Sequence, residues 1–361
     1  MPLKIRPAKD CEFDQMSLGE TMIRLSPPGK NRLEYAGVME VWVGGGEYNT
    51  SYGLARLGMR TGWISRQVDN PLGRLVINHA RAVGVDTSEV VMVQYDGVGR
   101  ADRQGLCFGE NGQGIRAAVT MYDRGHSAIS HVKPGEIDFK RIFSQRGVRW
   151  LHTGGIFTAL SDTTAAVVVE ACQAAKAAGT IVSYDLNFRS KLWSSQQAIE
   201  VTRPLMQHVD VLIGNEEDFQ KVLGFEVEGT DEDLKRLPIE NYKKMVQKVV
   251  EAFPNIQAVG TTLREVLSAN VNNWSAILYC DGQFHQSRRY EGLEIEDRVG
   301  GGDGFASGTM FALLSGKTPA EAVEYGAAHG ALLQMTPGDT SMANRAELED
   351  AVAGKGARIK R

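Results

Sequence analysis

Apolar segments rich in β-branched residues alternate with helix-length amphipathic segments from about residue 60 onward. The predicted strands are 62–68, 148–155, 180–187, 209–215 and 256–262, and two of the predicted helices are 72–85 and 163–179. Strands separated by helix-length segments are typical of right-handed βαβ units. The pattern therefore predicts an α/β fold: a doubly wound, mainly parallel sheet flanked by helices.

Two stretches break this alternation. Residues 31–43 and 103–122 read as short strands with no helix between them, and a Gly/Asn-rich turn joins the strands of the second stretch. We expect these insertions, at about 31–43 and 100–122, to form a small β lid at the carboxyl edge of the sheet, where it would exclude water from a reaction. The alternative is an edge hairpin with only a packing role.

The length fits one large domain, which we place at 12–355, with tails at 1–11 and 356–361. The acidic and then mixed-charge stretch 224–245 predicts a solvated excursion followed by a helix start. A net charge of −4 argues against nucleic acid or an anionic membrane as partner, since either needs a broad positive field. No apolar run approaches the roughly 20 residues of a membrane helix, so we expect a cytoplasmic protein. Four widely spaced cysteines indicate reduced, structural thiols.

The most informative segment is a glycine turn followed by a small-residue helix. Gly300, Gly301 and Gly302 would let backbone N–H groups converge at positive φ, and a helix predicted over Phe305–Ser315 would point its amino end at the same place. This arrangement predicts an anion cradle. Asp303 beside it is a candidate base for an attacking hydroxyl, and the alternative is that Asp303 only caps the helix.

Two familiar phosphate-binding motifs fit poorly. Gly316-Lys317-Thr318 supplies the end of a P-loop, but the position five residues before Gly316 is Phe311. The run Gly44–Gly46 lacks the third glycine of a dinucleotide-binding turn. A nicotinamide oxidoreductase is therefore a remote alternative.

The glycine turn resembles the carboxy-terminal motif of the PfkB (ribokinase) family of sugar kinases, D-T-x-G-A-G-D-x-F-x-x-G. Residues 297–308 match it, with Arg298 in place of the Thr and Gly301 in place of the Ala. The family's amino-terminal motif resembles Gly44-Gly45-Gly46 followed by Asn49 and the segment 52–58. The resemblance extends from about residue 17 to 345, and it implies a ribokinase-like fold with a β lid.

Within the family, segments 121–128, 183–193, 215–219 and 336–341 resemble kinases of 2-keto-3-deoxygluconate. The resemblance implies substrate contacts from Gly45, Asn49, Tyr122, Arg124 and Arg189, with Asp303 as base and Gly300, Gly301 and Gly302 around the transferring phosphoryl group. An arginine fork suits a carboxylate. Each residue also has a plainer alternative: a surface charge for Arg124, lid core for Tyr122, a helix cap for Asn49.

The resemblance further implies ATP and Mg²⁺, and it leaves a monovalent cation open. Nucleotide contacts are expected from Asn215, Thr262, Arg264, Gly300 and Gly302, and indirect metal contacts from Glu217 and Asp218. Three departures stand out. Cys107 occupies the place of a lid tyrosine, Asp218 replaces the Glu of the N-x-x-E motif, and the nucleotide loop, 259–275, is longer and more polar than usual.

These features predict ATP-dependent phosphorylation of the terminal primary hydroxyl of a sugar acid. The alternatives are a fructokinase, a 5-keto-2-deoxygluconate kinase, or a sugar-acid sensor that keeps the pocket without catalysis. Because exposed lid strands have free edges, we also predict a homodimer formed through the lid.

Overall fold

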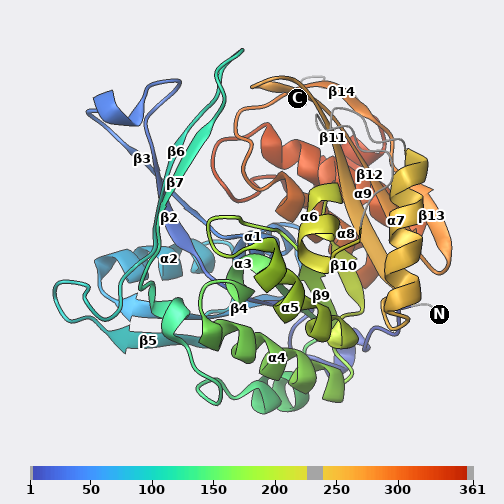
Figure 1. Cartoon of the computed structure of the whole chain (residues 1–361), viewed down its shortest axis with the longest axis horizontal. Helices are drawn as coiled ribbons and strands as arrows, with labels where there is room; N and C mark the ends of the chain where they lie inside the picture. Colours follow the sequence, from blue (N-terminus) through green and yellow to red (C-terminus); the bar gives the residue numbers. More distant parts are fainter. Residues whose placement is uncertain (1–2, 226–238, 356–361) are drawn as a thin grey trace.

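The computed structural model describes residues 3–225 and 239–355 (Figure 1). The expected excursion at 224–245 lies partly outside the described residues, and the tail 356–361 lies wholly outside them. The described part of the 1–11 tail packs against the body: Leu3 and Ile5 contact the core, and Arg6 Nη1 donates to the Phe143 carbonyl at 2.9 Å.

The central sheet has ten strands, and seven of them run parallel in the order β11-β10-β9-β8-β1-β4-β5. Antiparallel β12, β13 and β14 extend its other edge. The strands are β1 (Gln15–Leu18), β4 (Thr61–Asp69), β5 (Val90–Gln94), β8 (Trp150–Gly154), β9 (Ile181–Asp185), β10 (Val211–Ile213), β11 (Ala258–Ser268), β12 (Val271–Cys280), β13 (Gln283–Gln286) and β14 (Tyr290–Glu294).

Helices cover both faces of the sheet, which explains why its central strands are buried on both sides. One hydrophobic cluster lies under α4 (Asp162–Ala177), α5 (Ser195–Leu205), α6 (Glu216–Leu223) and α7 (Ile239–Ala252). A second hydrophobic cluster lies under α8 (Gly301–Leu314), α9 (Pro319–Gln334) and α10 (Arg345–Val352). Near β4, α1 (Gly46–Arg56) and α2 (Pro71–Arg81) enclose a third cluster, and short α3 (Gly155–Thr158) follows β8. The prediction of a doubly wound α/β fold is confirmed.

A separate four-stranded sheet forms the lid, in the order β3-β2-β6-β7 (Figure 1). Its strands are β2 (Met22–Ser26), β3 (Glu40–Gly44), β6 (Leu106–Glu110) and β7 (Val119–Asp123). Within 31–43, only the last residues are strand, and Leu33–Tyr35 forms a 3₁₀ turn. Strand β2 was not predicted, although it lies at the centre of the lid.

The lid reaches across to the main sheet. At its tip, the Gly114 carbonyl accepts from Ala269 N at 2.9 Å, and Gly114 N donates to Asn270 Oδ1 at 3.2 Å. Ala269 and Asn270 form the turn between β11 and β12, so the predicted nucleotide loop 259–275 is instead a long antiparallel hairpin. The lid and this hairpin together roof one pocket.

Candidate functional site

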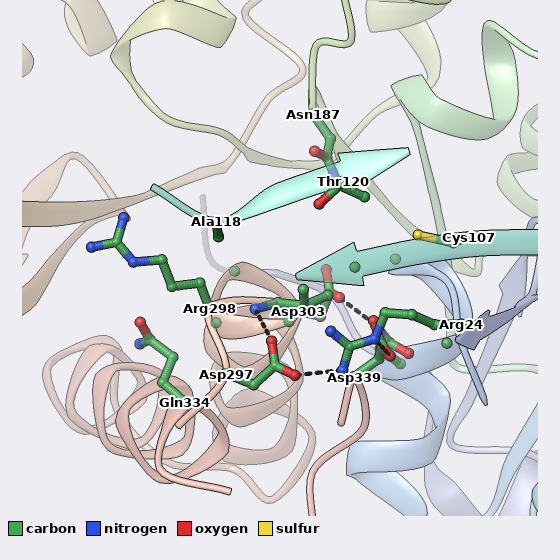
Figure 2. A pocket seen from close by; sticks show the side chains of 18 of the residues that line it. Arg24, Cys107, Ala118, Thr120, Asn187, Asp297, Arg298, Asp303, Gln334 and Asp339 are labelled. Carbon is green, nitrogen blue, oxygen red and sulfur yellow. Dashed lines mark hydrogen bonds and ion pairs between the residues drawn. The ribbon is translucent and has the colours of Figure 1, made fainter. Parts of the chain in front are cut away.

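The pocket is a cavity of about 660 Å³ between the carboxyl ends of the parallel strands, the lid and the amino end of α8 (Figure 2). Open α/β sheets bind ligands at this edge, and the volume is that of a small-molecule site. All of the predicted site residues line it: Gly45, Asn49, Tyr122, Arg124, Arg189, Asn215, Glu217, Asp218, Thr262, Arg264, Gly300, Gly301, Gly302 and Asp303.

Asp303 lies in the first turn of α8 and is only 9% exposed. Its Oδ2 accepts from Asn49 Nδ2 at 2.7 Å, and it forms no ion pair with a described residue. Burial raises the pKa of Asp303 to about 6, while the Asn49 hydrogen bond and the charge of Arg189 act in the opposite direction. The helix is capped by Gly300 rather than by Asp303, so the capping alternative does not account for this carboxylate.

The glycine turn differs in detail from its prediction. Only Gly300 has a positive φ, of 84°, while Gly301 and Gly302 are the first two residues of α8, which therefore begins four residues before Phe305. A Cβ on Gly300 would lie 2.5 Å from the Asp339 carbonyl, whereas a Cβ on Gly302 would meet nothing within 4 Å. The N–H groups of a first helical turn have no partner within the helix. The place where we predict an anion is thus the amino end of α8, with open space beside Gly302.

Asn49 joins α8 to the amino end of α1. Gly45 is the N-cap of α1, and its N–H donates to Asn49 Oδ1 at 3.1 Å, while Asn49 Nδ2 holds Asp303. A Cβ on Gly45 would overlap the carbonyl of Glu20, so only glycine lets the chain pass here. Asn49 therefore does more than close the start of α1: it links Gly45 to Asp303.

Arg124 and Tyr122 lie at the end of the lid strand β7. Arg124 forms an ion pair with buried Glu20, with Nε 2.8 Å from Oε2, and its guanidinium lies 5.2 Å from the centre of the Tyr122 ring. Its Nη1 forms no hydrogen bond with a described residue, so one edge of the fork remains for a ligand. Arg124 is therefore neither a free surface charge nor an uncompensated cation.

Arg189 is the cation on the opposite side of the pocket. Its Nη1 donates to the Phe188 carbonyl at 2.9 Å, and it forms no ion pair with any residue in the described ranges. Its charge lowers the pKa values of Asp185, Asp218 and Asp303, against the larger effect of burial, which raises all three. Arg189 thus lies near the carboxylates Asp185, Asp218 and Asp303, and its contact with the reacting end of a substrate stays a prediction.

The match to a known family extends from the glycine-turn motif over most of the chain. Residues 13–346 match the profile described as pfkB family carbohydrate kinase. The chain belongs to the pfkB family of carbohydrate kinases.

Three relatives illustrate the similarity of this kinase to characterised proteins. A 2-dehydro-3-deoxygalactonokinase of Haloferax volcanii is 31% identical over 346 residues, which is 96% of this chain and 98% of the relative. A 5-dehydro-2-deoxygluconokinase of Shouchella clausii is 28% identical over 324 residues, 89% of this chain and 90% of the relative. The crystal structure of a 2-dehydro-3-deoxygluconokinase from Thermotoga maritima has a TM-score of 0.87 and 37% identity, and covers 94% of this chain and 99% of that one.

The described residues offer few candidates for holding a metal in this kinase. Asn215 and Asp218 form a capping box at the start of α6, and Asp218 Oδ1 also accepts from Phe188 N at 2.8 Å. Both oxygens of Asp218 are therefore engaged with the backbone, and Glu217 beside it is exposed to the pocket. No group of three or more potential metal ligands occurs among the described residues. This donor set fits Mg²⁺ held mainly by phosphate oxygens and water, with Glu217 and Asp218 as outer contacts.

Several residues around the kinase pocket were not anticipated as functional. Arg24, from β2, forms ion pairs with Asp297 and, at 2.8 Å, with Asp339, and all three are buried (Figure 2). Glu47 is also buried beside Asp303, and burial raises its pKa to about 7. A buried arginine in a lid strand breaks the alternating pattern that marks strands in a sequence, and its partners are more than 270 residues away, so only the structure reveals the group.

We predict that Arg24→Met will strongly destabilise the fold. It leaves two buried carboxylates without their cation, a change that costs about 3–5 kcal/mol in comparable buried pairs. Burial already raises the pKa of Asp339 to about 6, so protonation at low pH will remove part of the penalty. Urea unfolding should show a larger loss of free energy at pH 8 than at pH 5. Arg24→Lys, which keeps the charge, is the control, and equal losses at both pH values would contradict the explanation.

Proposed function

We propose that the protein transfers the γ-phosphoryl group of MgATP to the terminal primary hydroxyl of a sugar acid, with 2-keto-3-deoxygluconate as substrate and its 6-phosphate as product. The observation that carries the proposal is Asp303: a buried carboxylate without a cationic partner, fixed by Asn49 at the amino end of α8, inside a pocket of small-molecule size.

The chemistry needs little covalent participation by the protein. The hydroxyl oxygen forms a bond to the γ-phosphorus, the bond from that phosphorus to the ADP oxygen breaks, and Asp303 takes the hydroxyl proton. A pKa near 6 leaves Asp303 ionised at neutral pH and still basic enough to accept a proton. The N–H groups of Gly301 and Gly302 would face the charge on the transferring group. Mg²⁺ would neutralise the phosphates, and Asn215, Thr262 and Arg264 line the expected nucleotide side.

Support for a sugar acid comes from the lid arginine and from the names of two similar proteins, a 2-dehydro-3-deoxygluconokinase and a 2-dehydro-3-deoxygalactonokinase. A second candidate is a 5-keto-2-deoxygluconate kinase, whose substrate is also a sugar acid, and it is favoured by the similarity to the relative of that name. The ion pair between Arg124 and Glu20 already neutralises the cation expected to hold a carboxylate, so it favours instead a neutral sugar, as a fructokinase would use. Membership of a carbohydrate kinase family weighs against the non-catalytic sensor.

The cytoplasmic location and the homodimer are part of the same proposal. None of the described helices could span a membrane.

The homodimer is supported by the exposed side chains of the lid. Val41, Val119 and Met121, on β3 and β7, are each 52% exposed, which supports pairing of two lids. We expect sedimentation to give the mass of a dimer, and expect Val119→Lys with Met121→Lys to give a monomer. A wild-type monomer at micromolar concentration would contradict this.

We predict that Asp303→Asn will lower kcat by at least about a hundredfold, the lower end of the range for general-base catalysis. ADP release with 2-keto-3-deoxygluconate measures the loss. In the wild type, kcat/KM should rise with pH through about 6, as Asp303 loses its proton, and this limb should disappear in the variant. Since the raised pKa means that the ionised carboxylate opposes folding above pH 6, the variant should unfold at an equal or higher temperature. Near-normal turnover would refute the role of Asp303.

We predict that Arg124 will distinguish the substrate classes. For a sugar acid, Arg124→Gln should raise KM about tenfold to a hundredfold, the effect of losing a charged hydrogen bond. Glu20→Gln should lower KM, because it frees the guanidinium. For fructose or another neutral sugar, Glu20→Gln should leave KM unchanged. Assays of both variants across keto-deoxy acids, ketoses and aldoses provide the comparison, and a neutral sugar as the best substrate would overturn the sugar-acid assignment.

A further inference from the structure

Arg298 is a half-buried cation in the pocket without an acidic partner. Its Nη2 donates to two neutral oxygens, the Ser268 carbonyl at 2.7 Å and Asn272 Oδ1 at 3.1 Å. Its Nε is inaccessible to solvent and has no acceptor among the described residues. The two pocket arginines of the lid, Arg24 and Arg124, are both ion-paired, whereas Arg298 forms no ion pair with a described residue.

A second arginine adds positive charge at the same place. Arg264 on β11 lines the pocket, forms no ion pair with a described residue, and lies close enough for its charge to affect Arg298. Burial, and then the charge of Arg264, lower the pKa of Arg298. Like charges held together without an anion are unfavourable, and a bound anion would relieve the repulsion between Arg298 and Arg264.

The position of Arg298 indicates which anion this is. It lies two residues before Gly300 and is anchored to the β11–β12 hairpin, where Thr262 and Arg264 are expected to meet the nucleotide. Figure 2 shows its side chain pointing away from the group formed by Arg24, Asp297 and Asp339. The residues expected to contact the sugar, Tyr122 on β7 and Arg124 directly after it, lie on the lid instead. Arg298 thus stands on the hairpin side of the glycine turn.

We propose that Arg298, together with Arg264, binds the phosphate chain of the nucleotide and holds its terminal phosphate against the amino end of α8. The guanidinium presents donors that match phosphate oxygens, and Nη1, which forms no hydrogen bond with a described residue, remains for this contact. Arg298 stands where the family motif has a threonine, so the contact belongs to this chain rather than to the motif. The inference rests on the proposed function, because it assumes a nucleotide as phosphoryl donor.

Arg298 also accounts for how this kinase manages with little metal support from the protein. Both oxygens of Asp218 are engaged by backbone N–H groups, so a fixed cation beside the glycine turn adds neutralising charge to that of Mg²⁺. The interaction between a guanidinium and the transferring phosphate becomes stronger as charge develops in the transition state. Arg298 should therefore influence kcat as well as nucleotide affinity.

The test compares Arg298→Thr, which restores the motif residue, with Arg289→Thr. Arg289 is an exposed arginine paired with Glu265 outside the pocket, so the control removes the same charge from a nearby surface. Calorimetric titration with ADP and with a non-hydrolysable ATP analogue, both with Mg²⁺ and without sugar, measures nucleotide binding directly. We expect Arg298→Thr to weaken it about tenfold to a hundredfold, as for a lost charged hydrogen bond, and Arg289→Thr to leave it unchanged. KM for the sugar should change less than twofold.

Because Arg298 also ties the turn to the hairpin, Arg298→Gln serves as a second variant that keeps a donor for Ser268 and Asn272. Arg298→Gln should fold like the wild type, and it should bind nucleotide more weakly than the wild type does. Unchanged nucleotide affinity in both variants overturns the inference, and so does a loss confined to KM for the sugar acid, which would assign the cation to the substrate carboxylate. If the wild type itself neither binds ADP nor phosphorylates any sugar, it is the proposed function that fails.

Discussion

The hydrogen bond from Asn49 to Asp303 joins two helix starts that are 254 residues apart in the chain. Asn49 receives the N–H of Gly45 on one side and donates to Asp303 on the other, so the residues expected to meet the sugar and the proposed base are held by one side chain. Close packing keeps α1 and α8 in these positions, because a Cβ on Gly53 would be too close to the side chains of Ser307 and His329. The position of the carboxylate thus depends on close packing between the two helices.

A second constraint connects the lid to the catalytic turn. Arg24 is in a central lid strand, and its two carboxylate partners lie on either side of Gly300. Asp297 comes three residues before Gly300. The carbonyl oxygen of Asp339 would be only 2.5 Å from a Cβ on Gly300. A buried arginine between two acids fixes geometry more effectively than it adds stability, since the desolvation of all three charges offsets their attraction. The lid is therefore anchored at its base by this group and at its tip by Asn270. A lid held between these anchors would favour phosphoryl transfer to a sugar over transfer to water.

The repeating part of the fold could be predicted from the sequence, because buried parallel strands and their helices leave strong periodic patterns. The strands around Trp63, Trp150 and Tyr184 and the helix at 163–179 were identified in this way. The β11–β12 hairpin was not, since its outer half mixes polar residues with the exposed Val266 and Leu267 and therefore has no regular burial pattern. Likewise, three glycines in a row indicate conformational freedom without saying which residue uses it. Only Gly300 adopts positive φ, because the helix already begins at Gly301.

The candidate site could be predicted where a motif is local and could not where residues meet only in three dimensions. Asp303 and Asn49 follow from two short motifs, whereas the environments of Arg24 and Arg124 depend on acids elsewhere in the chain. The substitution of Asp218 for a glutamate illustrates the difference. Its shorter side chain closes a capping box with Asn215 and reaches Phe188, which leaves it less able to bind a metal directly. The exchange keeps the negative charge, but it leaves less direct support for a metal, while Arg298 adds positive charge at the glycine turn. Both departures from the family pattern would therefore shift the neutralisation of a bound phosphate chain from the metal toward a protein cation.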